Sequence, residues 1–245
     1  MYGLIGKKLG HSFSAEFFNE KFKNEGIDES YQLLPIPSIN DFPSLLIKYP
    51  DLKGVNVTIP YKQEVIPFLD EISSEAEKIG AVNVIKITRL KDKIYLKGYN
   101  SDCIGFKISL EPLLKEKIKD ALILGTGGAS KAVAYVLSEL GIKYKFVSRN
   151  PSANQLSYSE LDKSILEKHL LIVNTTPLGM YPDIKNCPPI PYQFLSSSHI
   201  CYDLVYNPEE TQFMKNAAEF GAIVKNGLEM LILQALASWD FWTHK

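Results

Sequence analysis

The chain has 245 residues, 27 Lys and Arg against 28 Asp and Glu, and 45% hydrophobic residues. This length suits two modest domains or one large one, and the near-neutral charge gives no basic field for binding nucleic acid. No apolar run reaches membrane-spanning length, and we expect no signal peptide. Three cysteines without metal-ligand spacing favour a reducing cytoplasm and no metal site, namely Cys103, Cys187 and Cys201.

The first segment predicts a short strand, a loop and a helix. Residues 2–5 are an apolar strand, residues 6–13 a loop, and a helical pattern then ends at Gly26. Ser12 and Ser14 lie where the helix begins. Either serine could be an ordinary N-cap, or the two hydroxyls could hold a carboxylate at the helix N-terminus. The residues alone leave both interpretations open.

A second strand (31–36) and a helix (39–49) precede a segment in which valines alternate with Asn56 and Thr58. The alternation predicts another strand. Pro60 suits the first position of a following helix, which would place Lys62 in the first helical turn. A cation is unfavourable there, so Lys62 is a candidate for a lowered pKa and a working role; the alternative is a solvated surface lysine.

The next segment predicts a helix over 73–78 and a hairpin of strands 84–89 and 94–96, joined by a turn at 91–93. Asn83 falls at the mouth of the first hairpin strand. Asp102 begins an amphipathic helix that extends to residue 114, and its ordinary role there would be an N-cap.

A glycine-rich turn follows the apolar strand 121–124 and precedes a helical pattern that ends at Gly141. Gly125 allows a tight bend, and Gly127 lets a pyrophosphate approach the backbone. The helix N-terminus then offers N–H groups to the phosphates. Ser130 replaces the usual third glycine and is still small. The pattern predicts a dinucleotide site.

The next strand, 143–148, ends in Ser148, Arg149 and Asn150. An NAD-binding unit usually carries an acidic residue about 20 residues past the glycine turn, for the ribose 2′-hydroxyl. The arginine suits a 2′-phosphate instead, so the sequence favours NADP over NAD. The alternative is a glycine-rich turn beside a solvated surface arginine.

The remaining chain predicts three strands, a surface loop and two helices. In order, they are strand 170–174, proline-rich loop 188–191, strand 199–205, helix 209–220, strand 222–225 and apolar helix 227–242.

Six motifs stand in one order along nearly the whole chain. They are Ser12-Phe-Ser14, Asn56-Val-Thr-Ile-Pro-Tyr-Lys62, Gly80-Ala-Val-Asn83, Gly98-Tyr-Asn-Ser-Asp102, Gly125-Thr-Gly-Gly-Ala-Ser130 and Gly227-Leu-Glu-Met-Leu-Ile-Leu-Gln234. In this order they make the chain similar to the shikimate dehydrogenases, with Ser101 where that family has threonine. Motif order supplies context that a single short motif lacks.

The resemblance implies an α/β fold with an N-terminal substrate domain (1–101) and a C-terminal Rossmann domain (102–226). The last helix (227–245) would return to the N-terminal domain, and a cleft would lie between the domains. The implied reaction is the reversible NADPH-dependent reduction of 3-dehydroshikimate to shikimate, in chorismate and aromatic amino-acid biosynthesis. The resemblance implies a small-molecule substrate, no nucleic acid or membrane partner, and a monomer or homodimer.

The resemblance also implies the role of each site residue. Ser12 and Ser14 would bind the substrate carboxylate, and Lys62 and Asp102 would be the catalytic pair. Further substrate contacts would be Thr58, Asn83, Tyr206 and Gln234. Cofactor contacts would be Gly125, Thr126, Gly127, Gly128, Ala129, Ser148, Arg149, Asn174, Thr175, Val205 and Gly227.

One segment departs from the family pattern. After Asn150, relatives have a threonine and a second arginine that lead into a full helix, whereas residues 151–155 here predict a lost or shortened helix. The 2′-phosphate clamp would then lack its second cation. An NAD-using quinate/shikimate dehydrogenase is one alternative. A non-catalytic NADP sensor is another, which the presence of Lys62 and Asp102 disfavours.

Overall fold

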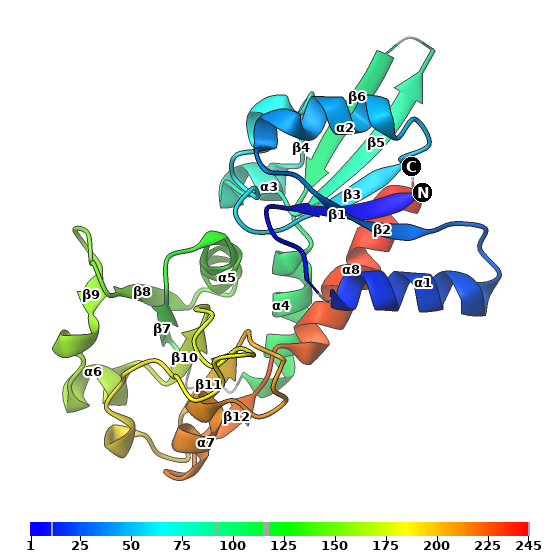
Figure 1. Ribbon diagram of the computed structural model, residues 1–245. Coiled ribbons are helices and arrows are strands. Elements are labelled where there is room, and N and C mark those ends of the chain that lie inside the picture. The colour runs from blue at the N-terminus through cyan, green and yellow to red at the C-terminus, as the bar shows by residue number, and fades with distance from the viewer. Residues whose placement is uncertain (11, 92, 115–117, 245) are drawn as a thin grey trace. The chain divides into compact units, whose positions relative to one another are not determined.

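The computed structural model describes residues 1–10, 12–91, 93–114 and 118–244. The chain divides into two compact units, one of residues 1–101 with 235–245 and one of residues 102–234 (Figure 1). The expected α/β fold class is confirmed, with one sheet in each unit. Among the described residues, no helix has the length and apolarity needed to cross a membrane.

The first unit is a mixed six-stranded sheet with the strand order β2-β1-β3-β5-β6-β4. β1 pairs in parallel with β2 and β3, whereas β5 runs antiparallel to β3 and β6. The strands are β1 (Tyr2–Gly6), β2 (Tyr31–Pro35), β3 (Gly54–Val57), β4 (Glu71–Ile72), β5 (Val84–Leu90) and β6 (Lys93–Tyr99); the helices are α1 (Phe13–Glu25), α2 (Phe42–Lys48) and α3 (Ser74–Ile79), with 3₁₀ turns η1 (Ile39–Asp41) and η2 (Ile66–Phe68).

The last turns of α8 (Leu228–Thr243) belong to the core of this unit. Trp242 packs with Phe18 of α1 and stacks on Tyr2 of β1, and its indole N–H donates to the Ile85 carbonyl at 3.1 Å. A Cβ at Gly54 would lie 2.4 Å from the Trp242 ring, so only glycine lets the helix approach β3 this closely. The expected return of the last helix to the N-terminal domain is therefore confirmed.

The second unit is a parallel sheet with the order β12-β11-β10-β7-β8-β9. Its strands are β7 (Asp120–Leu124), β8 (Lys143–Ser148), β9 (Leu156–Ser157), β10 (Leu171–Asn174), β11 (Ile200–Asp203) and β12 (Ile223–Lys225); its helices are α4 (Asp102–Leu110), α5 (Gly128–Glu139), α6 (Lys163–Lys168), α7 (Gln212–Ala218) and the first half of α8, with 3₁₀ turns η3 (Glu111–Leu113), η4 (Tyr158–Glu160) and η5 (Tyr192–Phe194). The chain runs outward from β7 in one direction and then returns to β10 on the other side. The strand order thus reverses between β7 and β10, where sheets of this kind bind ligands.

The prediction of a helix that begins at Pro60 is wrong. Residues 59–65 form consecutive turns, and η2 follows. The Lys62 carbonyl accepts the Val82 N–H at 2.7 Å instead of an N–H further along a helix, and the Ile66 N–H goes to the Gln63 carbonyl. Lys62 therefore does not stand at the positive end of a helix, and the argument from a helix dipole fails.

Other differences concern the lengths of elements. The helix expected over 39–49 begins as η1 before α2, and the helix expected over 209–220 is the shorter α7. No helix occupies the described residues 151–157, as expected for the departure after Asn150; a short parallel strand, β9, pairs there with β8. Of the expected hairpin turn at 91–93, Asp92 lies outside the described residues.

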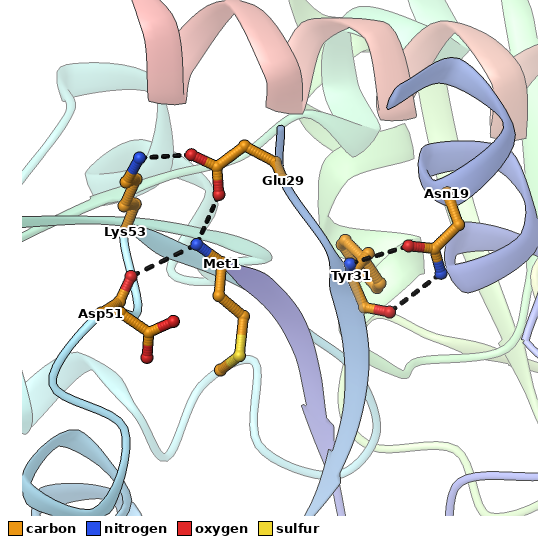
Figure 2. Close-up of polar contacts among 6 residues, drawn as sticks. All are labelled: Met1, Asn19, Glu29, Tyr31, Asp51 and Lys53. Carbon is orange, nitrogen blue, oxygen red and sulfur yellow. Dashed lines mark hydrogen bonds and ion pairs between the residues drawn. The ribbon is translucent and has the colours of Figure 1, made fainter. Parts of the chain in front are cut away.

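A partly buried carboxylate, Glu29, joins the residues that precede β1, β2 and β3 (Figure 2). The Glu29 carboxylate receives the Lys53 ammonium on one oxygen and the Met1 amino group on the other. Only 12% of its side chain is exposed. Burial by itself raises the pKa of Glu29, but the hydrogen bonds from Lys53 and the amino group outweigh it and hold the pKa below its ordinary value.

We predict that Glu29→Gln lowers the free energy of unfolding at neutral pH. Because the pKa of Glu29 is lower in the folded state, its contribution is complete above the ordinary value of 4.5 and is lost as the pH falls through the folded-state pKa. Denaturant unfolding from pH 3 to pH 7 measures the effect. The difference between variant and wild type should shrink toward acid pH. Glu25→Gln, which removes a more exposed ion pair with Lys21, is the matched control and should change little.

Candidate functional site

In the first unit, the Thr58 backbone is fixed where β3 ends. Its N–H donates to the Ile5 carbonyl of β1 at 2.9 Å. A Cβ at Gly6 would lie 2.7 Å from the Thr58 methyl group, so glycine is needed for this approach. Lys62 is half-buried and follows within the same turn segment. Thr58 and Lys62, both expected to contact substrate, therefore lie in a loop that backbone hydrogen bonds hold in place.

The two serines of the N-terminal motif differ in position. Ser12 is the N-cap residue of α1 by its backbone, but its side chain makes no capping hydrogen bond. Ser14 lies inside the first turn of α1 and is half-buried. The ordinary N-cap interpretation is therefore not supported by a hydrogen bond for either serine.

Asn83 is 3% exposed and lies in the segment before β5. Its amide nitrogen donates to the Ser101 hydroxyl at 3.0 Å, and its amide oxygen accepts the Ser101 N–H at 2.7 Å. Its backbone carbonyl accepts the Val57 N–H at 2.9 Å, beside Thr58. The first unit thus holds the Asn83 amide in one orientation.

In the second unit, the glycine turn has the geometry that a dinucleotide requires. Gly125 has φ +103°, and a Cβ there would lie 2.9 Å from both the Thr175 hydroxyl and the Thr176 methyl group. A Cβ at Gly127 would meet nothing within 4 Å, so the backbone there faces open space. Ser130 is buried and donates to the Gly127 carbonyl at 2.6 Å. The N-terminus of α5, with Gly128 and Ala129, follows directly.

At the carboxyl end of β8, the neighbouring strand, lie the residues that favour a 2′-phosphate. Ser148 pairs in register with Ser157 of β9, which brings Tyr158 toward Arg149. Burial raises the pKa of Tyr158, and the nearby Arg149 guanidinium partly offsets this. The Ser148 hydroxyl accepts the Asn150 N–H at 3.2 Å. An exposed arginine with two hydroxyl groups nearby fits the adenosine phosphate of NADP.

The loop after β10 is fixed to the glycine turn. Thr175 donates both its N–H, at 2.9 Å, and its hydroxyl, at 2.7 Å, to the Leu124 carbonyl. Asn174 is fully buried, and its amide oxygen accepts from the Thr176 N–H and hydroxyl. The Asn174 side chain is therefore engaged inside the unit, where it holds the loop after β10.

Sequence reasoning missed Asp203, the last residue of β11. Its carboxylate is fully buried and accepts from the Asn174 amide (2.9 Å), the Val205 N–H (3.0 Å) and the Thr211 hydroxyl (2.6 Å). These bonds connect the loops after β10 and β11. The sequence did contain a signal for this residue, namely an acidic residue at the end of an apolar strand. A charge buried there needs hydrogen-bond partners, which marks Asp203 as a structural or functional site.

The other expected residues of the second unit lie in or beside α4 and α8 and in the loop after β11. Asp102 is the first residue of α4 and is 7% exposed, and Gln234 is 8% exposed and donates to the Leu231 carbonyl of its own helix. Tyr206 is half-buried just after Val205. A Cβ at Gly227 would lie 2.1 Å from the Leu204 carbonyl oxygen, so glycine is required where α8 begins against this loop.

Comparisons with known proteins point to one family. A family profile described as the shikimate dehydrogenase substrate binding domain matches residues 4–85. A protein of Carboxydothermus hydrogenoformans named shikimate dehydrogenase (NADP(+)) is 39% identical over 98% of this chain and 90% of its own length. This chain belongs to the shikimate dehydrogenase family.

Solved structures agree with the shikimate dehydrogenase assignment. A chorismate mutase/shikimate 5-dehydrogenase fusion protein from Clostridium acetobutylicum superposes with a TM-score of 0.85 at 37% identity, over 99% of this chain and 90% of that one. A quinate dehydrogenase from Corynebacterium glutamicum, solved with NAD, gives a TM-score of 0.87 at 27% identity, over 100% of this chain and 93% of that one. Membership of the shikimate dehydrogenase family thus rests on nearly the whole chain.

We predict a pH signature from Asp203 in this shikimate dehydrogenase. Burial raises the pKa of Asp203 to about 6, although its three hydrogen bonds oppose the shift. A carboxyl group with a raised folded-state pKa binds protons more tightly when folded, so its contribution to stability grows as the pH falls from about 6 toward its unfolded value near 4. Asp203→Asn should remove this component from the measured free energy of unfolding. An unchanged slope between pH 4 and pH 7 would contradict the assignment.

Proposed function

We propose that this chain catalyses the reversible reduction of 3-dehydroshikimate to shikimate with NADPH, a step of chorismate and aromatic amino-acid biosynthesis. The observation that carries the proposal is similarity over nearly the whole chain to a protein named for this activity, at 39% identity. The six motifs, which contain most of the proposed substrate and cofactor residues, all lie within the matched region.

The residues of the second unit fit NADP. The open backbone at Gly127 and the N-terminus of α5 would receive the pyrophosphate, and Ser148 with Arg149 would hold the 2′-phosphate. Thr126, Asn174, Thr175, Val205 and Gly227 would shape the rest of this site. When bound, NADPH supplies the hydride. The chain's part is to hold the ring acid in place and to exclude water.

Substrate binding is assigned to residues of both units. Ser12 and Ser14 would hold the carboxylate of the ring acid, where the N-terminus of α1 also favours an anion. Thr58, Asn83, Tyr206 and Gln234 would contact the ring and its hydroxyl groups. The fixed orientation of the Asn83 amide, which Ser101 holds, supports this role.

Lys62 and Asp102 are proposed as the catalytic pair. When the ketone is reduced, negative charge develops on its oxygen atom. The Lys62 ammonium would stabilise that charge and hold the proton that the oxygen acquires, and the Asp102 carboxylate would orient the lysine. In the direction of shikimate oxidation, the same two groups would take the hydroxyl proton.

A second candidate is oxidation of quinate with NAD. The similarity to a quinate dehydrogenase that was solved with NAD favours it. Mixing the protein with shikimate or quinate, each with NADP or NAD, and recording the absorbance of the reduced nicotinamide separates the possibilities. We expect shikimate with NADP to give the highest kcat/KM. A preference for quinate with NAD would replace the proposal by this second candidate.

The same proposal places the reaction in the cytoplasm and the enzyme as a monomer or homodimer. The reductant NADPH and the small ring acid are soluble metabolites, which suits an enzyme without a macromolecular partner. Sedimentation of the purified chain distinguishes the monomer from the dimer, and a larger assembly would contradict both.

We predict that Lys62→Ala lowers kcat by roughly 10²- to 10⁴-fold, the range that a positioned acid–base group contributes. Steady-state assays with shikimate and NADP measure the loss. NADP binding and the thermal unfolding midpoint should stay near the wild-type values. Lys78→Ala, at an exposed lysine in the last turn of α3, is the matched control and should keep full activity. Turnover near the wild-type level in Lys62→Ala would refute the role.

We predict that Arg149→Ala raises KM for NADP by roughly tenfold or more, since a hydrogen bond to a charged group is lost. KM for NAD should change little, because NAD has no 2′-phosphate. The ratio of the two kcat/KM values is the measurement. Lys145→Ala, which removes another exposed cation from the same strand, is the control. A uniform rise of KM for both cofactors would contradict a role in discriminating between them.

A further inference from the structure

Five side chains of the first unit form a continuous chain of hydrogen bonds, which we call the hydroxyl–amide array. They come from five separate segments: β2, β3, the last turns of α8, the residue before α4, and the segment before β5. The members are Tyr31, Asn56, Ser238, Ser101 and Asn83. Each is at most 6% exposed. No member except Asn83 was assigned a role at the substrate site.

Asn56 is the centre of the hydroxyl–amide array. Its amide oxygen accepts the Tyr31 hydroxyl at 2.8 Å. Its amide nitrogen donates to the Ser238 hydroxyl at 3.0 Å and to the Asn83 carbonyl at 3.2 Å. Both N–H groups and the carbonyl of this amide are therefore used, which fixes its orientation.

The array continues from Ser238 to Asn83. The Ser238 and Ser101 hydroxyls lie 3.1 Å apart. Because Ser238 already accepts from Asn56, it can donate to Ser101. Ser101 then receives the Asn83 amide nitrogen at 3.0 Å and returns its own backbone N–H to the Asn83 oxygen at 2.7 Å.

The opposite end of the array reaches α1. Burial raises the pKa of Tyr31 well above its ordinary value, so the phenol stays protonated and acts as the donor to Asn56. The Asn19 side chain of α1 also holds the Tyr31 backbone on both sides, at 2.9 Å from its N–H and 3.0 Å from its carbonyl (Figure 2). The second turn of α1 is therefore fixed to β2 at Tyr31.

The array thus connects two segments that the proposed function assigns to the substrate: α1, which carries Ser14, and the segment before β5, which carries Asn83. Ser14 would bind the carboxylate, and Asn83 would bind a ring hydroxyl group. We propose that the hydroxyl–amide array sets the spacing between these two groups, and that Tyr31, Asn56, Ser101 and Ser238 are positioning residues for shikimate. This inference rests on the proposed function, since it takes Ser14 and Asn83 as substrate contacts.

Ser238 contributes from the returning helix. A buried serine in an apolar helix would ordinarily be a small packing residue, but here its hydroxyl joins Asn56 to Ser101. Removing this hydroxyl takes one hydrogen-bond partner away from Asn56 and from Ser101, both of which are buried. Their side chains can then turn, and Asn83 and Ser14 lose their fixed separation.

The test measures kinetics in Ser238→Ala, Ser101→Ala and Tyr31→Phe at temperatures where each is folded. We expect KM for shikimate to rise roughly tenfold, as for a lost hydrogen bond to a buried group. KM for NADP should stay within about twofold, because the second unit contains the proposed cofactor residues. Ser101→Thr keeps the hydroxyl and introduces the residue that the family has at this position. KM for shikimate in this variant should therefore stay near the wild-type value.

Ser109→Ala is the matched control. Ser109 is also fully buried, and its hydroxyl lies 2.6 Å from the Tyr202 hydroxyl in the second unit. It should lower the thermal unfolding midpoint without changing KM for shikimate. A similar rise in KM in this control would overturn the inference, because any lost buried serine would then have the same effect.

A double variant adds a readout that a merely structural role would not move. Tyr31→Phe and Ser101→Ala break the array at separate places. If the array acts as one unit, the double variant should raise KM for shikimate by less than the product of the two single fold-changes. Independent, fully multiplicative effects would overturn the inference, and so would wild-type KM values in the folded single variants. If Ser238→Ala does not fold, the other two variants carry the test. A wild-type protein without shikimate turnover would instead overturn the proposed function.

Discussion

A polar residue in the middle of a sheet constrains the first unit. β3 lies between β1 and β5 and is buried on both faces, yet it carries Asn56. An amide that cannot reach water must find its partners within the protein, or its burial costs folding free energy. The partners come from β2, α8 and the segment before β5. The packing of α8 against Gly54 and the position of α1 beside Tyr31 agree with this requirement.

The second unit meets a related demand at the carboxyl ends of its strands. The glycine turn needs space for a ligand, so the loops around it cannot be held by a large apolar side chain at that point. Short polar contacts hold them instead: Thr175 on the Leu124 carbonyl, and Asn174 on the Asp203 carboxylate. A buried carboxylate costs stability at neutral pH. We interpret that cost as the consequence of holding the loops after β10 and β11 by contacts to one buried carboxylate.

Much of this fold was predictable from local patterns. Alternating and continuous apolar runs gave the strands, and glycine at the helix ends gave the terminations of α1 and α5. The motifs placed Asn83, Asp102 and the glycine turn. The helix at Pro60 was wrong because the Lys62 carbonyl bonds to Val82, a contact that local spacing cannot reveal. Asp203 was visible only as one charge in an apolar strand.

Roles that depend on long-range contacts were also hidden. Tyr31 looks like any aromatic residue of a strand, and Ser238 like any small residue of an apolar helix. Their hydroxyl groups acquire a role only when segments 182 residues apart in the sequence, those of Asn56 and Ser238, come together. A single sequence gives residue types and spacing, whereas the direction of a hydrogen bond depends on the finished fold.

The return of α8 to the first unit has a consequence for biosynthesis. Ribosomes deliver the amino-terminal half of a protein first, but here Trp242 and Ser238 complete its core and its polar pairing. Residues 1–101 therefore emerge before the Trp242 side chain that packs on Gly54 is made, and their core cannot be completed until residue 242 has left the exit tunnel. The later-made residues 102–234 include no such late segment, so they are the part of this polypeptide suited to fold first.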